Sequence, residues 1–184
     1  MSDMGLAHYN DYLNGSEDAL EQLVRTYSDA LIRYAYCYVQ DATVAEDIME
    51  DTIVALIMKQ KRLRDGTSLR AYLYRIARNK SIDYLRRQKN HVPLQDVENI
   101  LMFGDLESAY SMRARNEAVY VCMQALPEQY KEVLQLTYFE GLSLQSAGRI
   151  MHKSIKQIYN LHNRAKAALK ELLIKEGISY EDLQ

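Results

Sequence analysis

Positive charge is concentrated in one stretch of this chain, Lys59 to Lys89, which reads KQKRLRDGTSLRAYLYRIARNKSIDYLRRQK. The stretch holds eleven Lys and Arg residues against only Asp65 and Asp83, although the whole chain has a net charge of −2. A local surplus of this kind attracts a polyanion, and nucleic acid is the most common polyanion that a protein meets. The stretch is therefore the first candidate for a binding surface.

From about Ser68 onward, the same stretch has the periodicity of a helix. On a 100° wheel one side groups the residues that we expect to be buried: Leu73, Ala77, Ser81, Tyr84 and Leu85, with Ile76 beside them. Another side gathers the candidate nucleic-acid contacts within a narrow arc: Tyr72, Arg75, Asn79, Asp83 and Arg86. Arg binds phosphate or a guanine edge, Asn pairs with adenine and Tyr stacks on an unpaired base. A solvated basic face remains the alternative interpretation.

An acidic ridge precedes the basic stretch. We expect a helix that starts with a capping box at Thr43–Glu46 and buries Ala45, Ile48, Met49, Thr52, Ile53 and Leu56. Its outward carboxylates are Glu46, Asp47, Glu50 and Asp51. This ridge would repel nucleic acid, so charge alone leaves a solvated face or a docking face for a protein. Nothing apolar surrounds these carboxylates to shift them toward general acid–base work.

The C-terminal part of the chain carries a helix-turn-helix pattern. Ser143 is placed to cap a short helix, and a tight turn at His152-Lys153 follows. Ser154 to Gln157 then form a capping box for the last helix. A short helix, a tight turn and a longer helix with a polar outer face are the plan of a DNA-reading motif. Its candidate contacts are Lys153, Lys156, Gln157, Tyr159, Asn160, Asn163, Arg164 and Lys166.

The remaining sequence predicts an all-α protein that positions these surfaces. Proline and glycine are scarce, with two and seven residues, while strong helix formers are plentiful. Ser16 reads as the N-cap of a long amphipathic helix, whereas residues 1–15 are polar and weakly patterned. Residues 90–112 lack a sustained apolar period and suggest a flexible linker between two small helical domains.

Several classes of function find no support in the sequence. No apolar run approaches the roughly 20 residues that span a bilayer, and no signal peptide is evident, so we expect no membrane insertion and a cytoplasmic location. Cys37 and Cys122 stand alone, which predicts small core residues and neither a disulfide nor a metal site. Without a glycine-rich phosphate loop or a nucleophile elbow, we expect no enzyme and no cofactor.

The combination of motifs resembles a known family. AEDIMEDTIVAL, LRAYLYRIARNKSIDYLRRQK, LPEQYKEVLQLTYFEGLSLQSAGRIM and RAKAALKELL look like bacterial RNA polymerase sigma factors of the extracytoplasmic-function (ECF) type, from about Leu20 to Leu173. The resemblance implies that residues 1–89 bind core polymerase and the minus-ten promoter element, and that residues 113–184 bind the minus-thirty-five element. It also implies help with promoter melting and a restraining anti-sigma factor.

The resemblance assigns expected roles to individual residues. Glu46, Asp47, Glu50 and Asp51 match the family's contact with the clamp helices of the largest polymerase subunit. Arg75, Asn79, Asp83, Arg86 and Arg87 match its promoter-facing helix, and the loop from Arg62 to Ser68 matches the place where an extruded base is gripped. Such capture fits the physics, because stacking and edge hydrogen bonds offset the few kcal/mol that an unstacked base costs.

The chain departs from the family pattern in its helix-turn-helix. His152 stands where many relatives have glycine, and Ala147-Gly148 stands where an Ile-Ala pair is common. The recognition helix reads Gln157-Ile158-Tyr159-Asn160-Leu161 where Thr-Val-Lys-Ser-Arg is frequent, and His162 replaces an apolar residue. The family's base contacts therefore cannot be copied onto Tyr159 and Leu161, and the promoter sequence does not follow.

A stand-alone helix-turn-helix regulator is the alternative function. Such a protein needs two reading heads, usually in a dimer with half-sites one helical turn apart. The sequence contains no heptad zipper or other clear dimerisation element. Binding to duplex DNA without polymerase would distinguish this regulator from a sigma factor.

Overall fold

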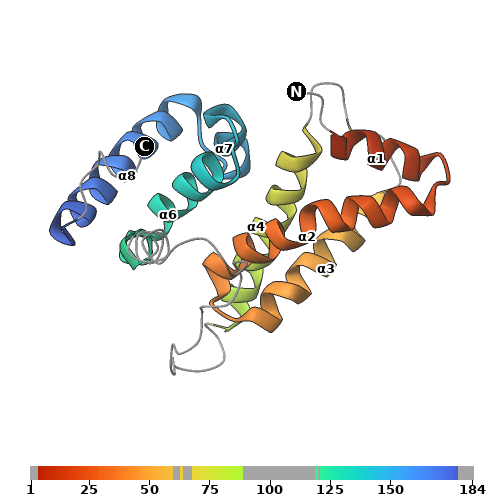
Figure 1. Ribbon diagram of the computed structural model, residues 1–184, viewed down its shortest axis with the longest axis horizontal. Helices are drawn as coiled ribbons and strands as arrows, with labels where there is room; N and C mark the ends of the chain where they lie inside the picture. The colour runs from red at the N-terminus through yellow and green to blue at the C-terminus, as the bar shows by residue number, and fades with distance from the viewer. Residues whose placement is uncertain (1–3, 60–62, 64–67, 89–118, 120, 178–184) are drawn as a thin grey trace.

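The computed structural model of the chain consists of two groups of helices (Figure 1). It describes residues 4–59, 63, 68–88, 119 and 121–177, and within these ranges we find helices and their connections and no strand. The predicted linker, residues 90–112, lies outside the described residues. The all-α prediction is confirmed.

The N-terminal domain contains α1 (Met4–Leu13), α2 (Glu17–Val39), α3 (Ala42–Lys59) and α4 (Leu69–Gln88). Helix α2 packs against the other three, and it begins as predicted, with the Ser16 hydroxyl accepting a hydrogen bond from the Ala19 N–H at 3.3 Å. Its buried side chains repeat at helical spacing through Leu23, Tyr27, Leu31 and Tyr34. This long helix is the centre of the domain.

Two details of this domain differ from the sequence-based expectations. The weakly patterned N-terminus forms α1, where Tyr9 is fully buried and donates a hydrogen bond to the Leu56 carbonyl at 3.4 Å. Helix α3 starts before the predicted capping box, because the Asp41 carboxylate accepts the Val44 N–H at 3.1 Å. Asp41 therefore does what we expected of Thr43, which lies inside the helix. The predicted inward stripe of α3 is confirmed, with Met49 only half-buried.

The C-terminal domain contains α6 (Glu128–Leu134), the π-helical turn η1 (Gln135–Phe139), α7 (Leu144–Ile150) and α8 (Ile155–Lys175). The predicted cap at Ser143 and the capping box of Ser154 with Gln157 are both present. The domain core includes Leu134, Leu136, Ile150 and Ile158. Helices α7 and α8 thus form the expected helix-turn-helix.

The turn of this motif explains the departures in its sequence. His152 has a left-handed φ of 54°, the conformation that glycine adopts without strain. A Cβ at Gly148 would lie only 3.0 Å from the Lys153 carbonyl oxygen, so α7 approaches the turn too closely for a larger residue. His152 thus occupies the left-handed position that glycine would adopt without strain, and Gly148 in α7 permits the close approach of that helix to the turn.

The two domains contact each other. Helix α4 packs beside α7, and α2 approaches α6 (Figure 1). In the part of the chain that the structure describes, no helix combines the length and the apolar character needed to cross a membrane.

Candidate nucleic-acid interfaces

Helix α4 separates a buried side from an exposed polar side. Leu73, Ala77 and Ser81 are buried, as predicted. The other predicted face points to solvent, with exposed side chains at Arg75, Asn79, Asp83, Arg86 and Arg87. Arg62, the remaining candidate on this side, lies outside the described residues. The helix therefore presents three arginines, one amide and the carboxylate of Asp83, which pairs with Arg86 at 3.6 Å, to anything that approaches the domain from this side.

Two cations lie near the ring of Tyr72 on this face. The Lys59 ammonium lies 4.0 Å from the centre of the Tyr72 ring, and the Arg75 guanidinium lies 5.3 Å from it. Such contacts contribute about 0.5–1 kcal/mol each at exposed sites. They orient the half-buried ring and draw Lys59 of α3 toward the basic side of α4. A stacked base at this ring would also meet positive charge.

The acidic side chains of α3 form the second exposed face. Glu46, Asp47, Glu50 and Asp51 are all exposed, as predicted. Asp51 also pairs with Lys80 of α4 at 2.8 Å, so it contributes to the packing of the two helices. We call the four residues the acidic ridge.

Two apolar side chains extend the acidic ridge, and the sequence reasoning missed them. Val54 is 49% exposed and Met58 is 77% exposed. With Asp47 and Asp51 they follow the spacing of four, three and four residues that places side chains on one side of a helix. The same periodicity could have revealed them. The acidic ridge is therefore continued by apolar area that is open to water.

Helix α8 carries the third face. Lys156, Gln157, Asn160 and Arg164 are exposed, and Lys153 is half-buried in the turn. The Gln157 side-chain oxygen accepts the Ser154 N–H at 2.9 Å, so its amide group is partly used in capping the helix. The Arg164 Nε donates to the Asn160 carbonyl at 3.4 Å. The remaining donors of this face are available to phosphate or base edges.

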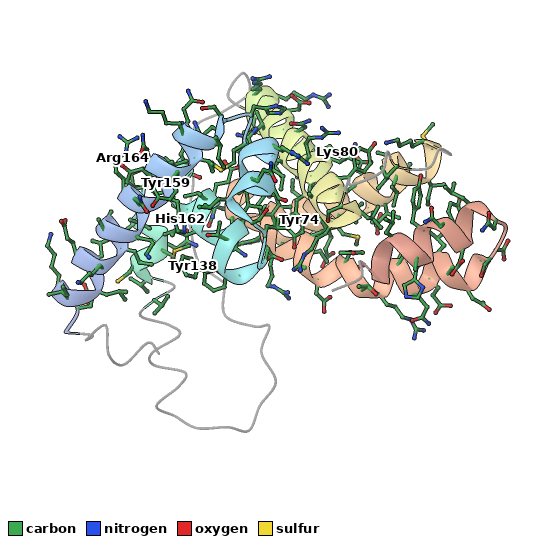
Figure 2. All side chains as sticks on the ribbon, turned by 90° about the horizontal axis from the view of Figure 1, so that it is seen from above. Tyr74, Lys80, Tyr138, Tyr159, His162 and Arg164 are labelled. Carbon is green, nitrogen blue, oxygen red and sulfur yellow. The ribbon has the colours of Figure 1, made fainter. Side chains whose placement is uncertain are left out.

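Tyr159 belongs to a different side of α8 from Asn160 and Arg164. It is 56% exposed and lies in helical register with Ile155 and His162. Figure 2 shows Tyr159, His162 and Tyr138 along the same part of the domain, where the rings of Tyr138 and His162 stack with centroids 5.7 Å apart. Tyr159 is therefore at the margin of the polar face, next to an aromatic pair.

His162 is a partly buried residue of α8. Its Nδ1 is buried without a hydrogen-bond partner, and burial, aided by the charge of Lys166, lowers the pKa of the imidazole. A lowered pKa favours the neutral imidazole, which is suited to stacking on the Tyr138 ring. Among the described residues no group of three His, Cys, Asp or Glu side chains is arranged to hold a metal ion.

Comparison with known proteins identifies the family of the chain that carries these faces. Residues 23–91 match sigma-70 region 2, and residues 116–169 match sigma-70 region 4. RNA polymerase sigma factor SigZ of Bacillus subtilis strain 168 is 30% identical over 158 residues, which cover 84% of this chain and 86% of the relative. The chain belongs to the ECF-type sigma factors of bacterial RNA polymerase.

Further relatives of this sigma factor also match it over most of their length. The RNA polymerase sigma factor CnrH of Cupriavidus metallidurans is 30% identical over 173 residues, covering 87% of this chain and 89% of CnrH. A solved structure of CnrH with the cytosolic domain of CnrY matches with a TM-score of 0.66 at 24% identity, over 92% of this chain and 97% of that one. The match confirms the two-domain fold.

A second solved structure has the same fold. The sigma factor RpoE of Bartonella quintana, in complex with the anti-sigma factor NepR, matches with a TM-score of 0.65 at 24% identity, over 83% of this chain and 95% of that one. As a sigma factor, the present protein binds core RNA polymerase and promoter DNA and directs transcription initiation. The alternative of a stand-alone regulator is therefore set aside.

Proposed function

We propose that the three exposed faces divide the work of this sigma factor between one protein partner and two DNA elements. The observation that supports this division best is the opposite charge of two adjacent helices in one domain. Helix α3 exposes the acidic ridge, while α4 exposes Arg75, Asn79 and Arg86. A single domain can then bind a protein on one side and nucleic acid on the other without either contact repelling its partner.

The acidic ridge is the proposed contact with core polymerase, on the clamp helices of its largest subunit. Glu46, Asp47 and Glu50 would pair with cations of that subunit, while Val54 and Met58 supply apolar area. Charge at the rim of such an interface mainly speeds association and fixes orientation. Apolar side chains that become buried would add to affinity, because their removal from water is favourable.

The α4 face is the proposed contact with the minus-ten element. Arg75, Arg86 and Arg87 would bind phosphates, Asn79 a base edge, and Tyr72 an unstacked base. Arg62 and the loop that contains it would complete the grip on an extruded base. Base capture of this kind favours the melted promoter over the duplex, because the unpaired base gains contacts that the paired base lacks.

The polar face of α8 is the proposed contact with the minus-thirty-five element. Lys153, Lys156 and Arg164 would bind phosphates, with Gln157 and Asn160 nearest to base edges. Tyr159 lies at the margin of this face and would contact sugar or a thymine methyl rather than replace a missing cation. The domains that carry these contacts are residues 1–89 and 113–184, with residues 90–112 between them.

The proposal has three further parts. The protein carries no catalytic activity of its own, because polymerase supplies the chemistry. It works in the cytoplasm, where promoter DNA and polymerase are found. An anti-sigma factor restrains it, since two sigma factors of the same fold have been solved with inhibitory or cytosolic partner chains.

Reconstitution tests the proposal. The free protein should bind duplex promoter DNA weakly, since a total charge of −2 and short contact surfaces release few counterions. Adding core polymerase should produce promoter-specific transcripts, and DNA selected by the holoenzyme should contain two conserved elements about 25 base pairs apart. Strong sequence-specific binding by the free protein, together with no binding to core polymerase, would contradict it.

A further inference from the structure

The first two turns of α8 expose the side chains that a helix-turn-helix brings nearest to base edges. Ile155, Lys156, Gln157, Tyr159 and Asn160 are all exposed there. Lys156 is the only cation among these five, whereas Arg and Lys make the commonest specific contact of proteins with guanine. This part of α8 therefore offers DNA mainly amides and apolar side chains, which suit other bases.

Leu161 takes no part in this face. Its side chain is 5% exposed and lies in the domain core with Ile158 and Ala165. The two positions where relatives frequently carry Lys and Arg thus hold an exposed ring, Tyr159, and a buried aliphatic group. Recognition of DNA by this helix must therefore rest on different chemistry.

Gln157 has only half of its side-chain amide left for DNA. Its Oε1 accepts the Ser154 N–H at 2.9 Å, while the Ser154 hydroxyl accepts the Gln157 N–H at 3.3 Å. A backbone N–H can only donate, so the Gln157 atom that faces it must be the amide oxygen. The bidentate contact of an amide with adenine requires that oxygen to accept from N6 while the amide nitrogen donates to N7. Gln157 can make this contact only by giving up the cap.

Asn160 keeps both halves of its side-chain amide. The side chain is exposed, and no hydrogen bond among the described residues engages it, since the Arg164 Nε donates to the main-chain carbonyl of Asn160 at 3.4 Å. Of the two amides in these turns, Asn160 is therefore the one that can pair with adenine without breaking a contact within the protein.

The Tyr159 ring is equally available. It is more than half exposed, and the ring-to-ring contacts among the described residues do not include it. Its neighbours one turn away along the helix are Ile155 on one side and His162, which stacks on Tyr138, on the other (Figure 2). Apolar and aromatic surroundings favour contact with a methyl group over contact with a phosphate.

An adenine–thymine base pair presents a partner for each of these two side chains in the major groove. Adenine offers the N7 acceptor and the N6 donor, and thymine offers its C5-methyl group. Consecutive Cα atoms lie about 3.8 Å apart, which is close to the spacing of about 3.4 Å between successive base pairs. Tyr159 and Asn160 are consecutive, so they can meet the same base pair or two neighbouring ones.

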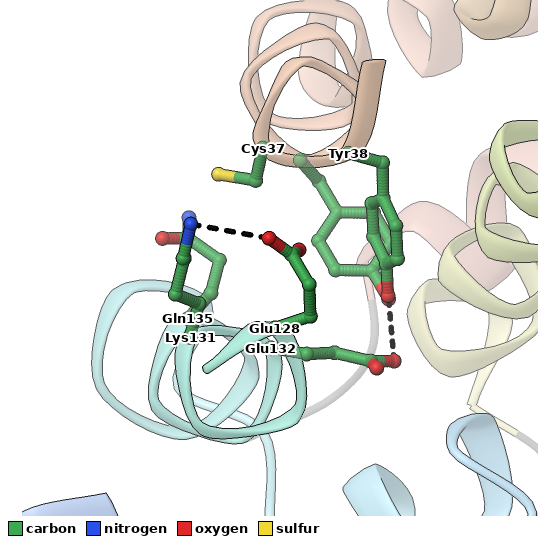
Figure 3. Close-up of a pocket in the computed structure, with 7 residues that line it drawn as sticks. Cys37, Tyr38, Glu128, Lys131, Glu132 and Gln135 are labelled. Carbon is green, nitrogen blue, oxygen red and sulfur yellow. Dashed lines mark hydrogen bonds and ion pairs between the residues drawn. The ribbon is translucent and has the colours of Figure 1, made fainter. Parts of the chain in front are cut away.

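The N-terminal domain does not cover this face. It contacts the C-terminal domain mainly through α6 and α7, as where the Arg78 Nε donates to Glu132 of α6 at 2.6 Å. The described residues that line the small pocket at this contact belong to α2, to α6 and, with Gln135, to η1, and none belongs to α8 (Figure 3). The outward face of α8 is thus open to DNA.

We propose that Asn160 and Tyr159 together read one adenine–thymine step of the minus-thirty-five element. Asn160 forms the bidentate pair with adenine, and the Tyr159 ring packs against a thymine methyl group of the same or the next base pair. Gln157 is a positioning residue that caps α8 and reads no base. Recognition of this step rests on the proposed contact of α8 with the minus-thirty-five element, to which it adds the identity of a base pair.

Base analogues test this recognition with the holoenzyme, on a promoter obtained by selection. Uracil in place of thymine removes only the C5-methyl group, and 7-deazaadenine in place of adenine removes only the N7 acceptor. Each thymine and each adenine of the minus-thirty-five element is replaced in turn, and binding is measured by competition. We expect one uracil to weaken binding about fourfold, the effect of one buried methyl group. One 7-deazaadenine at the same or the next base pair should weaken it about fivefold or more.

Matched protein variants assign each effect to its side chain. Tyr159→Ala should abolish the preference for thymine over uracil, whereas Tyr159→Phe should keep it because the ring remains. Asn160→Ala should abolish discrimination against 7-deazaadenine. Gln157→Glu keeps the capping oxygen and removes the amide donors, so it should weaken binding to all these promoters alike through its added negative charge. Gln129→Ala removes an exposed amide from α6 and should match the wild type.

The outcomes separate this recognition from the proposed function. A wild-type holoenzyme that binds the element but discriminates against neither analogue at any position overturns the recognition, and this scan does not depend on the folding of any variant. Thymine preference that persists in Tyr159→Ala overturns the aromatic contact. Discrimination against 7-deazaadenine that is kept in Asn160→Ala and lost in Gln157→Glu makes Gln157 the reader. A holoenzyme that selects promoters without any minus-thirty-five element contradicts the proposed function of α8, and the recognition fails with it.

Discussion

The Lys80 ammonium lies 2.8 Å from the Asp51 carboxylate and joins the basic helix α4 to the acidic helix α3. The side chain of Lys80 is 32% exposed and that of Asp51 is 66% exposed, so this ion pair contributes at most about 1 kcal/mol to stability. It has a practical meaning for mutagenesis nonetheless. Reversing the charge of Asp51 would disturb the packing of the domain as well as its surface, whereas Asp47 and Glu50 offer a cleaner test.

Charge reversal on the acidic ridge should therefore weaken binding to core polymerase before it affects folding. We expect the variant with Asp47→Lys and Glu50→Lys to bind at least tenfold more weakly in a core-binding titration, because two favourable pairs become repulsive. Its thermal unfolding should change little, since both side chains are exposed. Asp29→Lys, a single charge reversal on the exposed side of α2, is the control. Unchanged affinity for core polymerase would show that the acidic ridge is only a solvated face.

Truncation of the α4 face should impair promoter opening while core binding is kept. Arg75→Ala with Asn79→Ala removes a cation and a base-reading amide from exposed positions. Removing an interaction of this type costs about 1–3 kcal/mol, so open-complex formation should fall by tenfold or more. Permanganate reactivity of unpaired thymines measures this step. Arg33→Ala on α2 is the control, and an equal decrease in core binding would show that the faces are wrongly assigned.

Removal of cations from α8 should alter the salt dependence of upstream-element binding. Lys156→Ala with Arg164→Ala removes two exposed charges, so the slope of log K against log salt should fall by roughly 0.9 for each phosphate that is no longer neutralised. Holoenzyme titrations on a promoter at several salt concentrations measure the slope. Lys175→Ala, near the end of the same helix, should leave it unchanged. An unaltered slope in the double variant would remove both residues from the interface.

Replacement of the strained residue in the helix-turn-helix should stabilise the protein. His152 is exposed at a φ of 54°, so His152→Gly relieves backbone strain without removing core packing. We expect a gain of about 0.5–1 kcal/mol, measured by urea unfolding, and a decrease for His152→Val because β-branched residues tolerate this conformation poorly. A less stable glycine variant would indicate that the imidazole itself makes a stabilising contact.

Helix starts could be predicted from the sequence where a capping residue lies next to the helix that it caps. The caps at Ser16, Ser143 and Ser154 are all present, since a hydroxyl placed one turn before an apolar stripe has few other structural uses. Helix α3 starts two residues earlier than we predicted: Asp41 and Thr43 are both good capping residues, and the hydrogen bond from the Val44 N–H goes to Asp41. Helix α1 has no comparable capping signal, and it is held by tertiary packing of Tyr9 and of Leu6, Tyr12 and Leu13 against the core.

Contacts between distant residues could not be predicted in this way. In the sequence, nothing distinguishes Arg70, Tyr74 and Arg78 from other residues of a basic helix. Glu132 and Glu140 likewise look like solvent-exposed acids. Only the docking of α4 and α2 against the C-terminal domain makes them partners, at separations of 54 to 98 residues along the chain. For the candidate site, the exposed faces followed from helical periodicity, which could also have revealed Val54 and Met58, while the aromatic neighbours of Tyr159 required the structure.

Helix α4 carries both the row that grips Glu132 and Glu140 and the row that faces outward with Arg75 and Asn79. A continuous helix turns as one body, so a rotation that improves the fit of one row displaces the other. A change that rotates or shifts α4 as a whole would therefore affect both rows, whereas a substitution confined to an exposed side chain of the outer row would not.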